Sequence, residues 1–230
     1  MDGQKIHYHL EFEDKRTIDL DIVLDSKTLQ ILEPQPKANP SDWTGLETEK
    51  CSCCPLKESE SRRCPLALRI EAFIDVVKNE ISHTRVKVTV KTSERDYYKE
   101  VALQEVLGSI FGLIMATSGC PIMSYLKPMA RFHLPFASLE ESIVRSVSMH
   151  LLRQYYRALD DEEVSFDLDE LDQKYEDIQK VNLGLNKRIQ KLIKSGDASQ
   201  NSVAAFHAVS KLLSMNIQRN LQNYKYLFES

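Results

Sequence analysis

Residues 5–24 read KIHYHLEFEDKRTIDLDIVL, and this stretch decides the fold class of the N-terminal part of the chain. In residues 5–12 every second side chain is apolar, which is the pattern of a β-strand with one buried face. The polar run EDKR at 13–16 interrupts the alternation, and residues 17–24 resume it. The two segments are therefore predicted to form antiparallel neighbouring strands joined by a tight turn.

The rest of the predicted sheet lies on either side of one helix. Residues 27–32, KTLQIL, favour a third strand, and the valines of residues 84–92, TRVKVTVKT, alternate in the same way as the first strand. Between them, residues 66–80 carry apolar side chains at the spacing of a helix. Residues 1–96 are therefore predicted to form a small antiparallel sheet with one packed helix.

The second half of the chain has the periodicity of helices. We predict one long, buried helix over residues 97–118, ended by Gly119, because most of this stretch is apolar on most sides. The motif SLEE at Ser138 predicts a capping box and a further helix that runs to about Ala158. Residues 97–230 are thus expected to be all-helical, and the fold class of the chain is α+β.

Residues 167–228 have the pattern of an antiparallel helical hairpin. Apolar side chains recur at alternating spacings of three and four residues in two runs, and the sequence SGD at 195–197 separates the runs. Asn182 is a polar position within the first run. Further apolar side chains outside the runs either cover the core of the same chain or pair with a second protein. A protein partner and a homodimer are therefore both open.

Composition and charge exclude several classes of protein. The 230 residues carry a formal net charge of −4, which is too balanced for electrostatic binding of nucleic acid. The most apolar stretch, residues 106–116, is shorter than the roughly 20 residues that span a bilayer, so no membrane association is expected. The N-terminal residues lack the apolar core of a signal peptide. We therefore expect a cytoplasmic protein whose cysteines stay reduced.

The cysteines have a spacing that suits a metal site. Four of the five lie between Cys51 and Cys64, and the fifth is Cys120. Cys51 and Cys54 form a C-x2-C pair, which can place two thiolates on one tetrahedral ion. Proline follows Cys64 and suits the first position of a helix, whose N-terminus favours a thiolate. We predict that one ion is bound by four of the thiols: Cys51, Cys54, Cys64 and Cys120.

Zinc is the expected metal, because four thiolates make a closed tetrahedral site. An iron–sulfur cluster is the alternative, since a Cys-Pro pair also ends ferredoxin-type motifs. A third possibility is that the thiols are small buried apolar groups without a metal. A bound metal would attach the proline-rich loop 34–64 to the core, and Cys53 would remain outside the site.

Another candidate lies in residues 118–138, SGCPIMSYLKPMARFHLPFAS. His133 could bind a metal or act as an acid–base group, although a hydrogen bond to a backbone carbonyl is the more ordinary role. His7 and His9 share the polar face of the first strand, but the sequence shows no third ligand beside them. The motifs of nucleotide-binding loops, serine nucleophiles and zinc proteases are absent, so whether the protein is an enzyme stays open.

The stretches CSCCPL, CPLA, MATSGCP and RFHLPFAS, together with the closing hairpin, resemble a bacterial protein family of unknown function. The resemblance covers most of the chain and implies a bacterial cytosolic protein, with no catalytic residue to carry over. From the residues themselves, we expect a metal-stabilised intracellular protein that acts as an interaction or adaptor module. The alternative is an iron–sulfur or thiol-based redox protein, or an enzyme, that uses the cysteines and His133.

Overall fold

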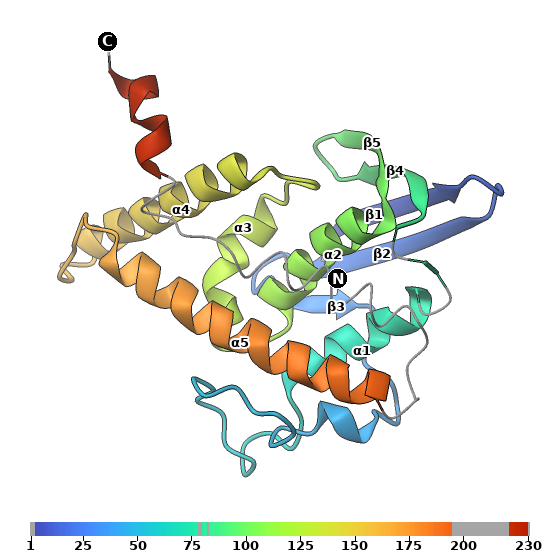
Figure 1. Ribbon diagram of the computed structural model, residues 1–230. Coiled ribbons are helices and arrows are strands. Elements are labelled where there is room, and N and C mark those ends of the chain that lie inside the picture. The colour runs from blue at the N-terminus through green and yellow to red at the C-terminus, as the bar shows by residue number, and fades with distance from the viewer. Residues whose placement is uncertain (1–2, 78–79, 82, 195–220, 230) are drawn as a thin grey trace.

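The computed structural model describes residues 3–77, 80–81, 83–194 and 221–229. Its centre is an antiparallel sheet of five strands in the order β3-β2-β1-β4-β5 (Figure 1). The strands are β1 (Gly3–Phe12), β2 (Thr17–Asp25), β3 (Ile31–Glu33), β4 (Arg85–Lys91) and β5 (Asp96–Ala102). Helices follow the sheet in the second half of the chain, so the predicted α+β class is confirmed.

The hairpin predicted from residues 5–24 is formed by β1 and β2. Their pairing places Ile6 opposite Ile22 and Tyr8 opposite Leu20. Because alternate residues of a strand point to opposite faces, one face of the sheet collects the apolar side chains. The buried side chains of this face are Ile6, Tyr8, Leu10, Phe12, Leu20, Ile22, Leu24, Val86, Val88 and Val90. The predicted alternation is therefore confirmed in three strands.

The prediction of a helix beginning at Tyr97 is wrong over its first six residues. Residues 96–102 form β5, which pairs with β4 from Arg85 opposite Ala102 to Lys91 opposite Asp96. A tight turn joins the two strands, where the backbone N–H of Thr92 donates to the carbonyl of Arg95 over 3.1 Å. By pairing with β4, β5 supplies hydrogen bonds to what would otherwise be an open edge of the sheet. The two tyrosines of DYYKEVA also favour a strand.

Two helices cover the apolar face of the sheet. They are α1 (Pro65–Val77) and α2 (Leu103–Thr117), and they share one hydrophobic core with the strands. The rings of Phe73 in α1 and Phe111 in α2 meet edge to face, with centroids 5.4 Å apart. Gly119 follows α2 with a positive φ of 90°, which confirms it as the residue that ends this helix.

Further helices lie around this core or beside a second, smaller cluster that includes Ile143 and Val147. They are the short η1 (Asp42–Thr44), η2 (Met123–Leu126), α3 (Lys127–Arg131), α4 (Leu139–Leu159), α5 (Asp169–Lys194) and η4 (Gln222–Phe228). The predicted capping box at the start of α4 is present, because Ser138 and Glu141 bond each other's backbone N–H groups. None of the helices in the described part of the chain is long and apolar enough to cross a membrane.

The first helix of the predicted hairpin is α5. Its apolar positions are buried against the rest of the chain at Leu171, Tyr175, Ile178, Val181, Leu185 and Ile189. Figure 1 shows α5 passing beside α1 and the loop that precedes α1. Most of the second predicted helix lies at 197–220, outside the described residues, so the pairing of the hairpin stays a prediction.

Candidate metal centre

The C-x2-C segment packs against α5. The backbone N–H of Cys54 donates to the carbonyl of Cys51 over 3.0 Å, which closes a tight turn. The thiol of Cys51 lies 3.9 Å from the carbonyl oxygen of Val181, and the thiol of Cys53 donates to the carbonyl of Asp177 over 3.4 Å. Both acceptors are residues of α5, so this helix forms one wall of the cysteine cluster.

Glycine allows this close approach. Gly184 is buried on α5, and a Cβ atom there would lie 2.7 Å from the Sγ of Cys51 and 3.3 Å from the carbonyl oxygen of Glu49. Real Cβ atoms do not approach other heavy atoms at 2.7 Å, so a side chain at this position requires the thiol of Cys51 to turn away and the carbonyl of Glu49 to shift slightly. The missing side chain therefore lets the loop backbone lie directly on the helix.

Cys64 and Cys120 come from the ends of α1 and α2. Pro65 is the first residue of α1, as the sequence predicts, and the N–H of Leu68 donates to the carbonyl of Cys64 over 3.1 Å. Gly119 directly precedes Cys120, and a Cβ at Gly119 would lie 3.8 Å from the Cβ of Pro65. The start of α1 and the end of α2 are thus adjacent, although the two cysteines are far apart in sequence.

The thiols lie close enough to influence one another's ionisation. Burial, assisted by the neighbouring Cys64, Cys53 and Cys120, raises the pKa of Cys51 to about 12. Burial also raises the pKa of Cys120 to about 11, with smaller contributions from Cys64 and Cys54 in the same direction. Without a cation these thiols therefore stay protonated at neutral pH. A bound metal ion would reverse this balance, because metal ligation stabilises thiolates.

The sulfur atoms are not assembled into a metal site. Among the described residues, no three cysteines have sulfur atoms that all lie within 4.8 Å of one another. Sulfurs around a tetrahedral zinc ion are about 3.8 Å apart, given Zn–S bonds of about 2.3 Å. Ligation therefore requires the side chains to turn toward a common centre. All five cysteines are free thiols, and soft sulfur donors of this number fit zinc or an iron–sulfur cluster.

A buried arginine holds the loop to α5. The guanidinium of Arg188 donates to the carbonyls of Trp43 and Gly45, each over 2.7 Å, and to the carbonyl of Leu46 over 3.0 Å. Only 2% of this residue is exposed. Sequence reasoning missed it, although an arginine directly before Ile189 on the apolar side of α5 was a possible signal. Metal ligation is therefore not the only means of attaching loop 34–64.

A second group of possible ligands lies on the polar face of the sheet. The carboxylate of Asp19 on β2 lies 2.8 Å from Nδ1 of His9 and 3.2 Å from Nε2 of His7. The pairing of β1 with β2 thus supplies the third ligand that the sequence alone did not show. Asp19 is exposed, and so is much of this face, where charged groups commonly pair without any metal.

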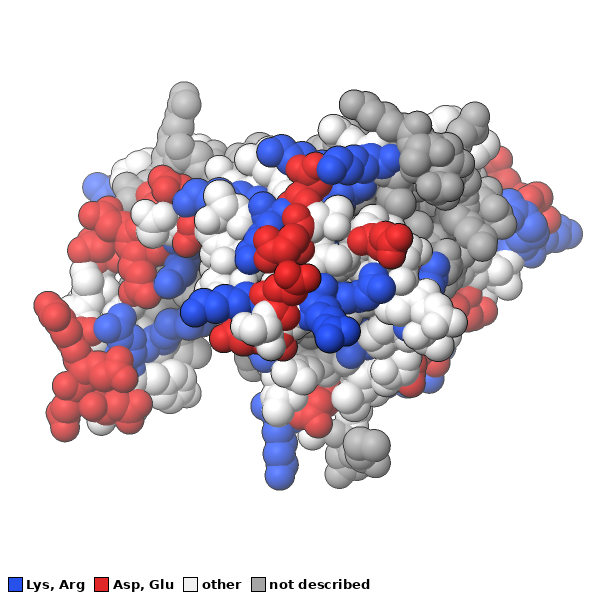
Figure 2. Space-filling view, turned by 90° about the horizontal axis from the view of Figure 1, so that it is seen from below, with Lys and Arg blue, Asp and Glu red and all other residues white. Residues whose placement is uncertain are grey.

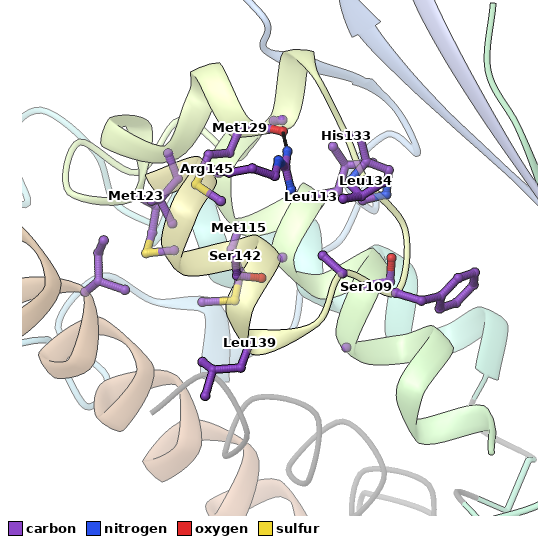
Figure 3. Close-up of a pocket in the computed structure, with 18 of the residues that line it drawn as sticks. Ser109, Leu113, Met115, Met123, Met129, His133, Leu134, Leu139, Ser142 and Arg145 are labelled. Carbon is purple, nitrogen blue, oxygen red and sulfur yellow. Dashed lines mark hydrogen bonds between the residues drawn. The ribbon is translucent and has the colours of Figure 1, made fainter. Parts of the chain in front are cut away.

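His133 lies elsewhere, in the wall of a cavity between the helices (Figure 3). Its Nε2 is 2.6 Å from the hydroxyl of Tyr8, which is in turn 3.0 Å from the hydroxyl of Ser109. Burial, assisted by the positive charge of Arg145, lowers the pKa of His133 to about 4. The imidazole is therefore neutral at physiological pH, and its partner is a side chain rather than the backbone carbonyl that we considered the ordinary case.

Charged side chains of both signs lie interspersed on the face of the molecule shown in Figure 2. This arrangement agrees with the small formal net charge of −4. The comparisons with known proteins supply no activity for the site. No curated protein matches the chain, and no solved structure matches it either. The model of the family described as Domain of unknown function (DUF6901) matches residues 6–229, and the chain therefore belongs to this family, as a resemblance to a family of unknown function implied.

Proposed function

We propose that the protein binds one metal ion, with zinc as the preferred metal, through Cys51, Cys54, Cys64 and Cys120. The observation that supports this is that thiols from three distant segments lie near enough to influence one another's pKa. The segments are the C-x2-C turn, the start of α1 and the end of α2. The side chains would have to turn toward a common centre to bind the ion.

The role of such an ion is structural. Four thiolates close the coordination sphere, which leaves no open position for a substrate. The ion would join the loop, α1 and α2 at a single point, and the free energy of metal binding would add to the stability of the fold. Cys53 stays outside this set, because its thiol is directed to the carbonyl of Asp177. An iron–sulfur cluster needs the same four thiolates and is the alternative occupant.

The second part of the proposal is that the metal-stabilised fold acts as an interaction module. One stripe of α4 exposes apolar side chains to solvent: Val144, Leu151, Tyr155 and Leu159. The adjoining face of α4 is buried through Ile143 and Val147. Large exposed apolar stripes commonly mark surfaces that bind another protein. A second copy of the chain is the occupant that sedimentation tests directly.

Metal analysis of the full chain tests the first part. We expect about one zinc ion per chain after purification without added metal. Serine at Cys51, Cys54, Cys64 or Cys120 should abolish tight binding, whereas Cys53→Ser is the matched control and should retain it. His9→Gln should also retain the metal, which separates the cysteine site from the group on the sheet.

The outcomes separate the alternatives. A colourless protein with zinc supports the proposal, and visible absorbance with bound iron assigns the iron–sulfur alternative instead. A metal-free protein whose five thiols all titrate would refute the metal site. For the second part, concentration-dependent mass in sedimentation that is lost in Tyr155→Ser supports self-association through α4. A monomer at all concentrations would refute self-association.

A further inference from the structure

A cavity of about 510 Å³ lies between α2, α3, α4 and α5 (Figure 3). Small-molecule sites in proteins commonly measure roughly 300–1,000 Å³. The cavity meets α5 at Tyr175, Ile178 and Asn182, whereas the cysteines meet the same helix at Asp177 and Val181. It is therefore a separate site on a different face of α5, and the proposed metal ion does not account for it.

One polar side chain in the cavity wall has no partner. Asn182 is fully buried, and neither its Oδ1 nor its Nδ2 is hydrogen-bonded to any atom of the described residues. A buried amide left without partners is costly, because folding removes its hydrogen bonds to water and returns none. The residue lines the cavity, but both amide atoms are covered, so a bound group that donates and accepts would satisfy them after the neighbouring side chains shift. A hydroxyl group is the simplest group of this kind.

One positive charge in the wall is also available. Nη2 of Arg145 donates to the carbonyls of Met129 and Phe132, over 3.0 and 2.6 Å. These bonds position the guanidinium, and they leave its Nε and Nη1 donors without a partner among the described residues. The carboxylate of Glu141, which caps the start of α4, attracts the guanidinium, but no ion pair with Arg145 is present among the described residues. The other charged lining residue is Glu105, and its Oε2 lies 3.8 Å from Nζ of Lys99.

The rest of the wall is apolar and adaptable. Met115, Met123 and Met129 contribute flexible thioether side chains, which adjust to the shape of a ligand. On α2, Gly108 and Gly112 line the cavity, and no described heavy atom lies within 4 Å of a Cβ built at either position. These glycines leave open space where longer side chains would fill the cavity.

We propose that this cavity binds a small hydroxy-carboxylic acid with an apolar chain. The carboxylate accepts a single charge-assisted hydrogen bond from Nη1 or Nε of Arg145, because Nη2, which both bidentate edges of the guanidinium share, already donates to Met129 and Phe132. The hydroxyl group satisfies the amide of Asn182, and the chain between them packs on the methionines. The geometry assigns no reaction to the ligand, so the cavity is a binding site.

Calorimetric titration of the full chain tests the proposal. The probes are ω-hydroxy acids from hydroxyhexanoate to hydroxydodecanoate, with the matching diols and unsubstituted acids as controls. We expect one chain length to bind best, and the matching diol to bind at least about tenfold more weakly. Arg145→Gln should produce a similar loss, and Asn182→Leu should abolish the preference for the hydroxy acid over the plain acid.

A further variant removes the space without touching the polar groups. Gly108→Leu should fold, since its side chain enters open space, and it should weaken binding of the best probe about tenfold or more. Thr17→Leu adds the same side chain at an exposed position of β2, away from the stripe on α4, and should bind as the wild type does. The proposal is overturned if no probe binds, if diol and acid bind equally, or if a correctly folded Gly108→Leu binds like the wild type.

Discussion

Replacing Gly184 by alanine should destabilise the protein, although the same change normally stabilises a helix. In a helix interior, alanine is favoured over glycine by about 1 kcal/mol. At Gly184 the new methyl group would lie 2.7 Å from the Sγ of Cys51, well inside the normal carbon–sulfur contact distance. Overpacking of this kind costs about 1–3 kcal/mol. The free energy of unfolding should therefore fall by up to about 2 kcal/mol.

Gly112 supplies the matched control. It also lies inside a helix, but no described heavy atom is within 4 Å of a Cβ built there. Gly112→Ala should therefore raise the free energy of unfolding by about 1 kcal/mol, whereas Gly184→Ala lowers it. The free energies of unfolding of the two variants should differ by roughly 1–3 kcal/mol. Equilibrium unfolding in urea, followed by circular dichroism, gives both values from the transition midpoints.

A double-mutant cycle identifies the atom responsible. Cys51→Ala removes the sulfur that the new methyl group would meet, so Gly184→Ala should cost less in the Cys51→Ala background than in the wild type. Metal content should also fall in the single variant Gly184→Ala, because the thiol of Cys51, a proposed ligand, must turn away from α5. If Gly184→Ala stabilises the protein as much as Gly112→Ala does, the loop does not lie on this helix, and the placement of Cys51 is refuted.

Three further outcomes follow from buried polar groups. Burial lowers the pKa of His133 from its ordinary 6.5 to about 4. The stability that depends on the neutral imidazole is therefore complete above pH 6.5 and is lost as pH falls toward 4, by up to about 3 kcal/mol, and this slope should be absent from the unfolding curves of His133→Gln. Arg188→Met leaves three carbonyls without their donor and should lower the free energy of unfolding by about 3 kcal/mol or more. The fluorescence of Trp43 should shift to the red and proteolysis within 34–64 should become faster, and an unchanged emission spectrum would contradict this. Asn182→Leu removes a buried amide without partners and should raise the free energy of unfolding by about 1–2 kcal/mol, and a large loss of stability would mean that the amide is paired.

The sheet could be predicted because the alternation of apolar and polar residues that forms it lies within short stretches of sequence. The alternation in residues 5–24 determines which side chains of β1 and β2 face the core, and a shift of one residue would expose all of them. The start of α1 at Pro65 and the cap of α4 at Ser138 are equally local, since each depends on the chemistry of a few neighbouring residues.

The strand β5 shows where local information fails. Residues 97–102 precede a strongly apolar helix, and their own pattern does not show where that helix begins. The open edge of β4 decides the matter, because β5 supplies its missing hydrogen bonds. That edge is a property of the assembled sheet, and no short stretch of sequence contains it.

The candidate sites depend still more on distant contacts. Sequence spacing could suggest that Cys51 and Cys54 act together, but it could not show that Cys64 and Cys120 lie at the adjoining ends of two helices. The same holds for Asp19, which reaches His7 and His9 only through the register of β1 and β2. Asn182 was visible as a polar interruption, but its position in a cavity wall was not.

The helix α5 touches both candidate sites with neighbouring residues. Val181 faces the thiol of Cys51, and the next residue, Asn182, lines the cavity. A ligand at either site that moves this helix therefore changes the free energy of binding at the other. Thermodynamic reciprocity then requires equal factors in both directions: whatever the metal does to the affinity for the acid, the acid does to the affinity for the metal. The two occupants would thus be linked through one turn of helix, with no contact between them.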